Sequence, residues 1–314
     1  MKQQRLRSAA GFTLIELLIS LAIASLVVLY LAENYSHTSK MYVHNKEKYQ
    51  TQTRALLTSD YISQEIRNAG YIVGWDATPD ALPLTVNQPI TGAAVDANTE
   101  SLTVRYAQGP LTGVGAPVAT LVAPWPAVGS STLTVQAIPA AMGNIPNGTL
   151  VAIYSPPSTI NVRRVAAASN VGATTITLVN PTSFAFTAGT VVATVQESSF
   201  WLQGGNLQMR TAGANQQIAR NVEDLQVAFI NKDQSVIGNV SSATFAGMTT
   251  AQLRDVRAVR LSLTARTSRP LVDVLFVVPP SLEDHDRNGE PADQVLRVIE
   301  QTTVYLRNLG LLDS

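Results

Sequence analysis

Few side chains in this 314-residue chain are of types that support catalysis or metal binding. The sequence has no cysteine and three histidines, which excludes disulfides, cysteine-ligated zinc and thiol catalysis. It contains no nucleophile elbow, phosphate-binding loop or metalloprotease helix. One segment, Asp284–Glu290, begins like a calcium loop, with oxygen ligands at alternate positions and glycine at the sixth. The twelfth position is Val295 where such loops need Glu, although Glu290 or Asp293 could substitute as a ligand. We therefore expect a solvated acidic loop, no metal and no cofactor.

The balanced charge points away from a general nucleic-acid binder and, together with the lack of Cys and the few His, from an enzyme. Lys+Arg and Asp+Glu number 22 each, and charged residues make up 14% of the chain, against about 25% in an average soluble domain. Five arginines could form a DNA-binding face, but few aromatic residues lie among them, so we expect them to keep a strand face in water. These are Arg254, Arg257, Arg260, Arg266 and Arg269. His37 and His44 lie seven residues apart and are expected on a polar helix surface, and Trp75, Trp125 and Trp201 are expected in packing roles.

The charges at the N-terminus are one-sided. Lys2, Arg5 and Arg7 precede an almost wholly apolar segment, residues 12–31, whose twenty residues would span about 30 Å as a helix, the thickness of the hydrocarbon core of a bilayer. Basic residues before the span predict a cytoplasmic N-terminus and an exported remainder. A cleaved secretory signal is the alternative, which the length of the run and the lack of a small-x-small site disfavour.

Glu16 is the informative residue of this span. A carboxylate in a membrane segment costs a few kcal/mol and usually has a partner or a function, and the span holds no Lys or Arg. A new amino terminus at Phe12 would lie about one helical turn before Glu16, on the same face, and would supply the cation. The alternative is a Glu16 side chain that simply reaches one interface.

The run Gly11-Phe12-Thr13-Leu14-Ile15-Glu16, after a short basic leader, resembles the class III signal of type IV pilins and type II secretion pseudopilins. The resemblance implies cleavage between Gly11 and Phe12 by the prepilin peptidase, which also methylates the new amine of Phe12. It further implies that Glu16 neutralises an N-terminal amine during filament assembly.

Neither Gly nor Pro occurs from Phe12 to Ala69, which predicts one long helix over residues 12–69, with residues 12–31 in the membrane and Gly70 capping its end. The domains expected are a cleaved leader, residues 1–11, this helix, and a head, residues 70–314. A stripe on the second half of the helix is predicted to pack on the head. It comprises Met41, Tyr49, Leu56, Tyr61, Ile62, Ile66 and Ala69.

The head is predicted to be rich in antiparallel strands that pack against the helix, which is an α+β fold. Turn-bounded, β-branched runs predict strands over 131–135, 150–154 and 174–179, and Gly204-Gly205-Asn206 predicts a hairpin. Further strands are expected over 222–229, 260–266 (with one wet face) and 302–307. Residues 77–196 carry little charge, which could mark either a contact surface or an ordinary secreted β-domain.

Residues 65–71, 206–210, 221–227 and 302–308 resemble recurrent elements of PilW-type minor pilins. The resemblance implies a minor pilin, not an enzyme, that takes part in filament initiation and so in pilus-dependent motility or adhesion. Its partners would be the prepilin peptidase, other minor pilins, the major pilin and the inner membrane. The precursor would be a single-pass inner-membrane protein with a periplasmic head, and the assembled form would lie at the cell surface. Two alternatives stay open: a minor pseudopilin of a type II secretion system, and a pilus-tip adhesin.

Overall fold

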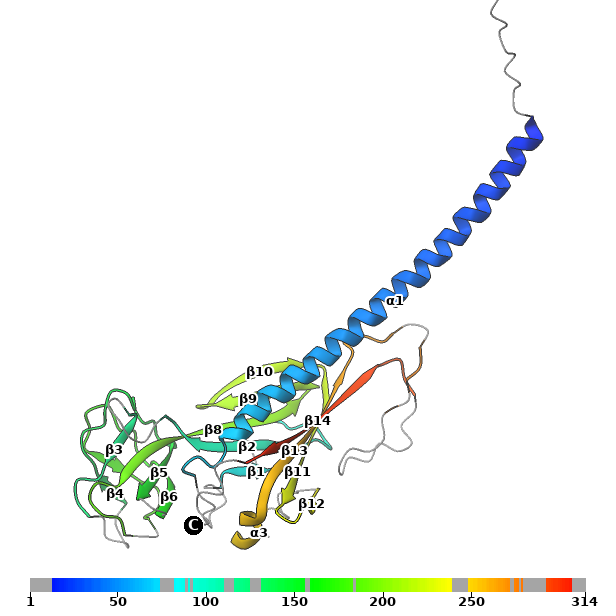
Figure 1. The fold of residues 1–314 in the computed structure, drawn as a ribbon. Coiled ribbons are helices and arrows are strands. Elements are labelled where there is room, and N and C mark those ends of the chain that lie inside the picture. Colours follow the sequence, from blue (N-terminus) through cyan, green and yellow to red (C-terminus); the bar gives the residue numbers. More distant parts are fainter. Residues whose placement is uncertain are drawn as a thin grey trace, which may run out of the picture.

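The fold, seen in a computed structural model, is a long helix attached along its second half to a β-rich head (Figure 1). The structure describes residues 13–73, 82–87, 90, 93–109, 116–124, 131–155, 159–182, 185–238, 248–271, 274–276, 278 and 292–306. Every strand pairing among them is antiparallel, as the sequence predicts.

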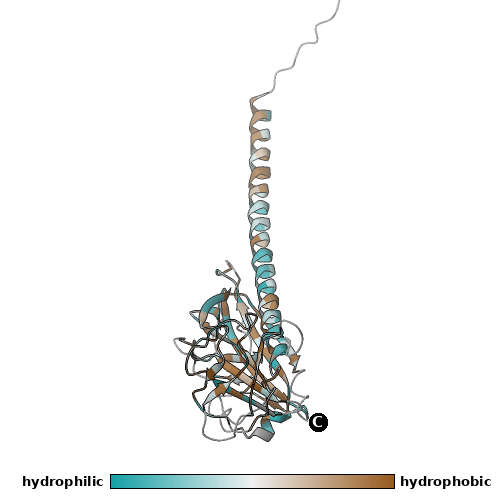
Figure 2. Ribbon diagram, turned by 90° about the vertical axis from the view of Figure 1, so that its left-hand side faces the viewer, coloured by the Kyte–Doolittle hydropathy of each residue, from teal (hydrophilic) through white to brown (hydrophobic). Residues whose placement is uncertain are grey.

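The helix α1 spans Leu14–Asn68, 55 residues without a break, because no Gly or Pro interrupts it. It ends at Ala69, and Gly70 follows with a φ of +78°, the left-handed conformation that glycine adopts most readily. Figure 2 shows its apolar N-terminal half standing clear of the head, whereas its C-terminal half lies along it.

The first sheet is organised around one long strand, β8 (Val191–Gln203). Its first half pairs with β3 (Val118–Thr120) and β5 (Leu150–Ser155), and its second half with β2 (Leu102–Ala107) and β9 (Asn206–Thr211). The outer strands are β1 (Leu84–Val86), β6 (Thr159–Arg164) and β10 (Ala214–Arg220). The predicted hairpin is confirmed: β8 and β9 are joined at Gly204 and Gly205, both at positive φ.

A second, four-stranded sheet runs in the order β12-β11-β13-β14. These strands are β11 (Val222–Asn231), β12 (Val236–Ile237), β13 (Val256–Arg266) and β14 (Arg297–Tyr305), with the short helix α3 (Thr250–Asp255) leading into β13. The helix α3 was not predicted from the sequence.

The described part of the head has two large apolar cores and a smaller cluster, which comprises Val73, Leu150, Ala152, Val162 and Val195. The larger lies between α1 and the two sheets and includes Ile62, Ile66, Phe200 and Phe229. The second lies in a distal lobe, which we define as residues 116–190, and includes Leu133, Ile153 and Phe186. This lobe contains β3, β5, β6 and a two-stranded sheet of β4 (Thr132–Thr134) and β7 (Thr175–Thr177), and lies at the end of the head farthest from the start of α1 (Figure 1).

Two predictions about packing are wrong. The helical stripe is right at Ile62, Ile66 and Ala69, which are fully buried, but Met41, Tyr49 and Leu56 are 52%, 70% and 54% exposed. The face turned to the head in that part of α1 carries smaller or polar side chains instead, which let the helix approach closely: Glu47, Thr51, Ala55, Thr58 and Ser59.

The second wrong prediction concerns the wet face of strand 260–266. Ser262 and Thr264 on that face are fully buried, so both faces of β13 are covered in the folded chain. The alternation of polar and apolar residues predicted the strand correctly and its environment incorrectly, because alternation shows which residues share a face but not what covers that face.

Candidate assembly site

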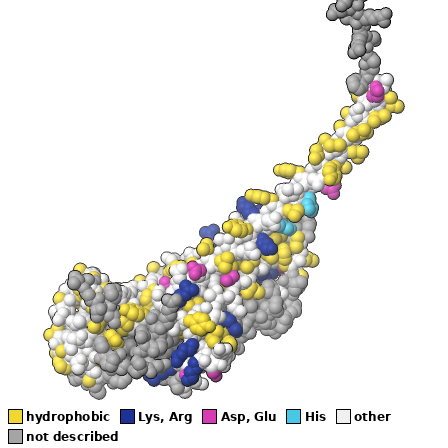
Figure 3. All heavy atoms as spheres, in the orientation of Figure 1, with side chains coloured by type: hydrophobic (Ala, Val, Ile, Leu, Met, Phe, Trp, Pro, Cys, Tyr) yellow, Lys and Arg dark blue, Asp and Glu magenta, His cyan; other side chains and the backbone are white. Residues whose placement is uncertain are grey.

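No described residue of the head packs around the N-terminal half of α1. Its large apolar side chains from Leu14 to Leu31 are 50–80% exposed, and an 18-residue window of the helix with a mean hydropathy of 2.5 is long and apolar enough to cross a membrane. None of that window is buried, unlike the core helix of a soluble protein. Figure 3 shows apolar side chains along the face of this part of the helix that is in view. Apolar surface of this extent marks a lipid or protein contact.

The polar side chains of this segment bond to the helix itself. The hydroxyl of Ser20 donates to the carbonyl of Glu16 (2.7 Å), and the hydroxyl of Ser25 donates to that of Ala22 (2.8 Å). Such bonds satisfy the hydroxyls without water, which suits an apolar surrounding.

Glu16 closes a capping box with Thr13 at the start of α1. The Thr13 hydroxyl accepts from the amide of Glu16 (3.3 Å), and the Glu16 carboxylate accepts from the amide (2.9 Å) and the hydroxyl (3.0 Å) of Thr13. The partner expected for Glu16 was a cation alone, and Thr13 was not predicted, although Thr-x-x-Glu before an apolar run is the capping-box pattern. The carboxylate is thereby fixed at the helix N-terminus, where the helix dipole favours negative charge. Gly11 and Phe12, the predicted processing residues, lie outside the described residues.

A group of polar contacts lies where α1 meets the head. We call it the polar latch; it joins Glu47 and Arg54 of α1 to Arg266, Ser268 and Arg269. Glu47 is 6% exposed, and its carboxylate accepts from Nε of Arg269 (3.1 Å) and from the hydroxyl of Ser268 (3.1 Å). Two turns further along, Nη1 of Arg54 donates to the carbonyl of Arg266 (3.2 Å). The last residue of β13 and two residues of the loop that follows it thus bond to one side of the helix.

Further contacts continue along both flanks of α1. The hydroxyl of Ser59 donates to that of Thr302 on β14 (3.2 Å), and the hydroxyl of Tyr61 donates to the sulfur of Met209 on β9 (3.2 Å). Near the helix end, the hydroxyl of Tyr106 donates to Glu65 (3.0 Å). Burial, and then the nearby charge of Glu65, raise the pKa of Tyr106, so this hydroxyl stays protonated and keeps donating.

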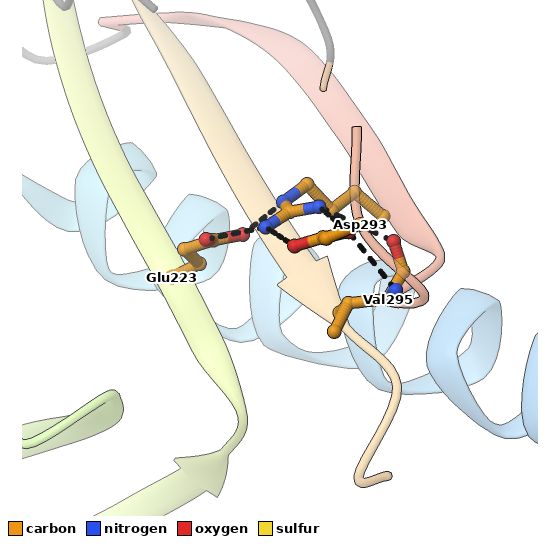
Figure 4. A network of polar contacts seen from close by, with 4 residues as sticks. Glu223, Asp293 and Val295 are labelled. Atoms are coloured by element: carbon orange, nitrogen blue, oxygen red, sulfur yellow. Dashed lines mark hydrogen bonds and ion pairs between the residues drawn. The ribbon is translucent and has the colours of Figure 1, made fainter. Parts of the chain in front are cut away.

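A second polar network, drawn in Figure 4, lies at the end of the second sheet where β11 and β14 begin. The guanidinium of Arg297, 6% exposed, donates to both carboxylate oxygens of Glu223 (2.6 and 3.1 Å) and to both of Asp293 (2.8 Å each). Asp293 was a possible calcium ligand, but here it is committed to Arg297, and the rest of the predicted loop, residues 284–291, lies outside the described residues. No group of His, Asp and Glu side chains in the described part of the chain is arranged to hold a metal ion.

The five arginines considered for DNA binding are spread over α3, the whole length of β13 and the loop after it. Arg257 donates to the carbonyl of Arg254 (2.5 Å), and Arg269 donates to Glu47.

Of the tryptophans, Trp201 is 1% exposed, as predicted for a packing role, and Trp75 and Trp125 lie outside the described residues.

Two parts of the chain match known protein families. Residues 6–32 match the prokaryotic N-terminal methylation motif, and residues 186–308 match type IV pilus-assembly protein W. The chain is a type IV pilin-like protein with a class III signal. Its structure resembles that of a type IV-like pilin from Thermus thermophilus, with 11% identity, 82% of this chain and 96% of that chain covered, and a TM-score of 0.34. No curated protein matches the sequence.

The two family matches cover different parts of this pilin-like protein. The first covers the signal and the exposed half of α1, and the second covers β8 to β14, which comprise the whole second sheet and β8, β9 and β10 of the first. Most of the distal lobe precedes the second match. The matches point to a structural, non-enzymatic minor pilin anchored in a membrane by one helix.

Proposed function

We propose that this chain is a PilW-like minor pilin that takes part in the initiation and assembly of a type IV pilus. The single observation that carries the proposal is the division of α1 into two different halves. The N-terminal half is exposed and apolar and has Glu16 in its first turn, whereas the C-terminal half is attached to a head that matches the pilus-assembly domain. A helix of this kind is stable either in lipid or among similar helices, because both surroundings cover its apolar surface.

The proposed mechanism is mechanical. The prepilin peptidase removes residues 1–11 by cutting between Gly11 and Phe12 and methylates the new amine. The helix, residues 12–31 of which cross the inner membrane, then leaves lipid for a bundle formed with other minor pilins and the major pilin. In that bundle the carboxylate of Glu16 pairs with an N-terminal amine. Its charge would otherwise be unpaired in an apolar surrounding.

The capping box supports this role for Glu16. Thr13 already holds the carboxylate at the helix N-terminus, one residue from where the new amine of Phe12 would begin the chain. Fixing the carboxylate beforehand reduces the entropy that its ion pair has to overcome.

Two other functions remain as alternatives. A minor pseudopilin of a type II secretion system would use the same signal and anchor in a different machine. A pilus-tip adhesin is favoured by one observation: the distal lobe has its own core and carries charge, among its described residues, only at Arg163 and Arg164. An adhesin would lose surface attachment, but not pilus formation, when this lobe is trimmed.

The test compares three full-length variants in the native host. Glu16→Gln removes the charge and retains a side chain that completes a capping box, whereas Glu16→Ala removes both. Glu33→Gln alters an exposed carboxylate of α1 beyond the span and serves as the control. We expect all three to insert in the membrane, and only the Glu16 variants to be depleted from sheared pili. Normal incorporation of Glu16→Gln would sink the role assigned to this carboxylate.

A further inference from the structure

Among the described residues, no strand pairs with the outer edge of β14. This strand lies at the end of the second sheet and pairs with β13 through nine consecutive residue pairs without a bulge. It contains no proline, and its charged residues are Arg297 and Glu300. Edge strands in native proteins are commonly blocked by prolines, bulges, lysines or a covering element, since an open edge attracts other strands. β14 has no proline, bulge or lysine of its own.

The ladder shows which backbone groups face outward. The amide of Leu306 donates to the carbonyl of Arg257 (2.9 Å), and the amide of Thr267 donates to that of Leu296 (3.0 Å). In an antiparallel pair, alternate residues bond to the neighbouring strand, so the even-numbered residues of β14 face β13. The odd-numbered residues direct their amides and carbonyls to the other side. There the backbone groups of Ile299, Thr303 and Tyr305 meet no hydrogen-bond partner from the described residues.

The flank of α1 adds an apolar wall to this edge. β9 and β10 lie on one side of the helix and β13 and β14 on the other (Figure 1). Ser59 faces β14, and Leu56 lies one turn earlier on the same flank of the helix. Tyr61, which contacts β9, lies about 140° around the helix from Leu56. Leu56 and Tyr49, seven residues before it, are 54% and 70% exposed. A strand added to β14 would have its inner side chains against them.

We propose that β14 accepts an extended segment of another protein chain, which adds a strand to the second sheet and packs apolar side chains against Leu56 and Tyr49. The outward-facing amides and carbonyls of β14 recur every second residue, about 7 Å apart, a spacing that another extended backbone matches. Leu56 and Tyr49 are the exposed apolar side chains of this flank, so the added segment carries apolar residues at the alternate positions that face them.

The donor is a different chain, not a second copy of this one pairing through its own β14. Arg54 lies by Arg266, which pairs with Arg297, and Ser59 lies by Thr302, so β14 runs in the same direction as α1. Two β14 strands paired antiparallel would therefore point their α1 helices in opposite directions. This step rests on the proposed function, because it requires that both chains are anchored in one membrane.

The test uses a photo-crosslinking phenylalanine analogue in place of Tyr305, which is 71% exposed, in the full-length protein within assembling cells. The same analogue at Gln216, an exposed residue of β10, is the control. In the Tyr305 background, Thr303→Pro removes one outward amide without breaking the ladder to β13, and Thr303→Val keeps that amide. Leu56→Glu, which leaves β14 intact, tests the wall separately.

We expect a crosslink from position 305 to an extended segment of a different chain that has apolar residues at alternate positions. The yield of this crosslink should be unchanged with Thr303→Val. It should fall about tenfold with Thr303→Pro and with Leu56→Glu, as a loss of ~1.4 kcal/mol in binding would produce. To show that Thr303→Pro is folded, its thermal unfolding midpoint must equal that of Thr303→Val. If the midpoints differ, the crosslink yield of Leu56→Glu decides whether the proposal stands. Equal crosslinking in all variants, or a crosslink only between copies of this chain, would overturn the proposal. Pilus yield from the Glu16 variants tests the proposed function separately from this pattern.

Discussion

The carboxylate of Glu47 is buried at the end of the head nearest the exposed half of α1, with Nε of Arg269 at 3.1 Å, although Glu47 and Arg269 are 222 residues apart in sequence. Before Glu47, the described part of α1 has no buried residue, and after it every turn has one. The pair therefore marks where the helix leaves the head. About 16 residues, or roughly 24 Å of helix, separate it from the end of the apolar span at Leu31.

Replacing Glu47 should loosen this junction. Glu47→Ala removes two charge-assisted or polar hydrogen bonds, and we expect the free energy of unfolding of the head to fall by about 1–3 kcal/mol. The exposure of the Arg269 side chain favours the lower end of that range, since water can replace the lost partner. Urea unfolding of the detergent-solubilised protein measures the change. Glu33→Ala, which alters an exposed carboxylate of the same helix, should leave stability unchanged, and an equal effect of the two variants would contradict the latch.

The stability of the head should depend on pH through Asp293. Hydrogen bonds from Arg297 hold the pKa of Asp293 below its ordinary value. A lowered folded-state pKa gives stability that is fully present above the unfolded-state pKa, about 3.9, and is lost as the pH falls through the folded-state value. The difference in unfolding free energy between the parent and Asp293→Asn should therefore shrink below about pH 4. Denaturant unfolding from pH 6 to pH 3 measures it, and a difference that stays constant over this range would refute the assignment.

Gly109, at the point where the chain leaves β2 towards the distal lobe, should tolerate no side chain. Its φ is +74°, and a Cβ there would lie 2.4 Å from Cγ of Pro117. Gly148 has a similar φ of +82° with nothing within 4 Å of a Cβ, so it isolates the backbone effect. We expect Gly148→Ala to cost about 1 kcal/mol and Gly109→Ala about 1–3 kcal/mol more. Thermal unfolding of both variants measures this, and equal midpoints would show that Pro117 yields without penalty.

Thr13 should matter for assembly through the position of Glu16. Thr13→Ala removes the hydroxyl from the capping box and leaves the charge of Glu16 in place, whereas Thr13→Ser retains both. If the proposed function holds, Thr13→Ala should reduce incorporation into pili, but less than Glu16→Ala does, and Thr13→Ser should not. Immunoblots of sheared pili against membrane fractions measure this. Wild-type incorporation of Thr13→Ala would show that the carboxylate needs no positioning.

Much of the fold could be predicted from local signals. The unbroken helix follows from the lack of Gly and Pro before Gly70, the β8–β9 hairpin from Gly204-Gly205, and the strands from β-branched runs. Each of these features is decided by residues close together in sequence.

The packing of α1 could not be predicted in the same way. The stripe was assigned by hydrophobicity, which selected Tyr49 and Leu56, but the head contacts Glu47 and Ser59 instead. Those contacts depend on Arg269 and Thr302, which are more than 200 residues away in sequence, and no local period reports them. Thr13 was within reach of sequence reasoning, because the capping box is a four-residue pattern.

The most direct test of the central claim compares a strain that lacks this protein with its parent, scoring surface pili and the release of secreted enzymes in the same cultures. A minor pilin of a type IV pilus predicts lost or sharply reduced pili with normal secretion, restored by the parent gene but not by Glu16→Gln. Normal pili with lost secretion would contradict the account and assign the chain to a secretion system.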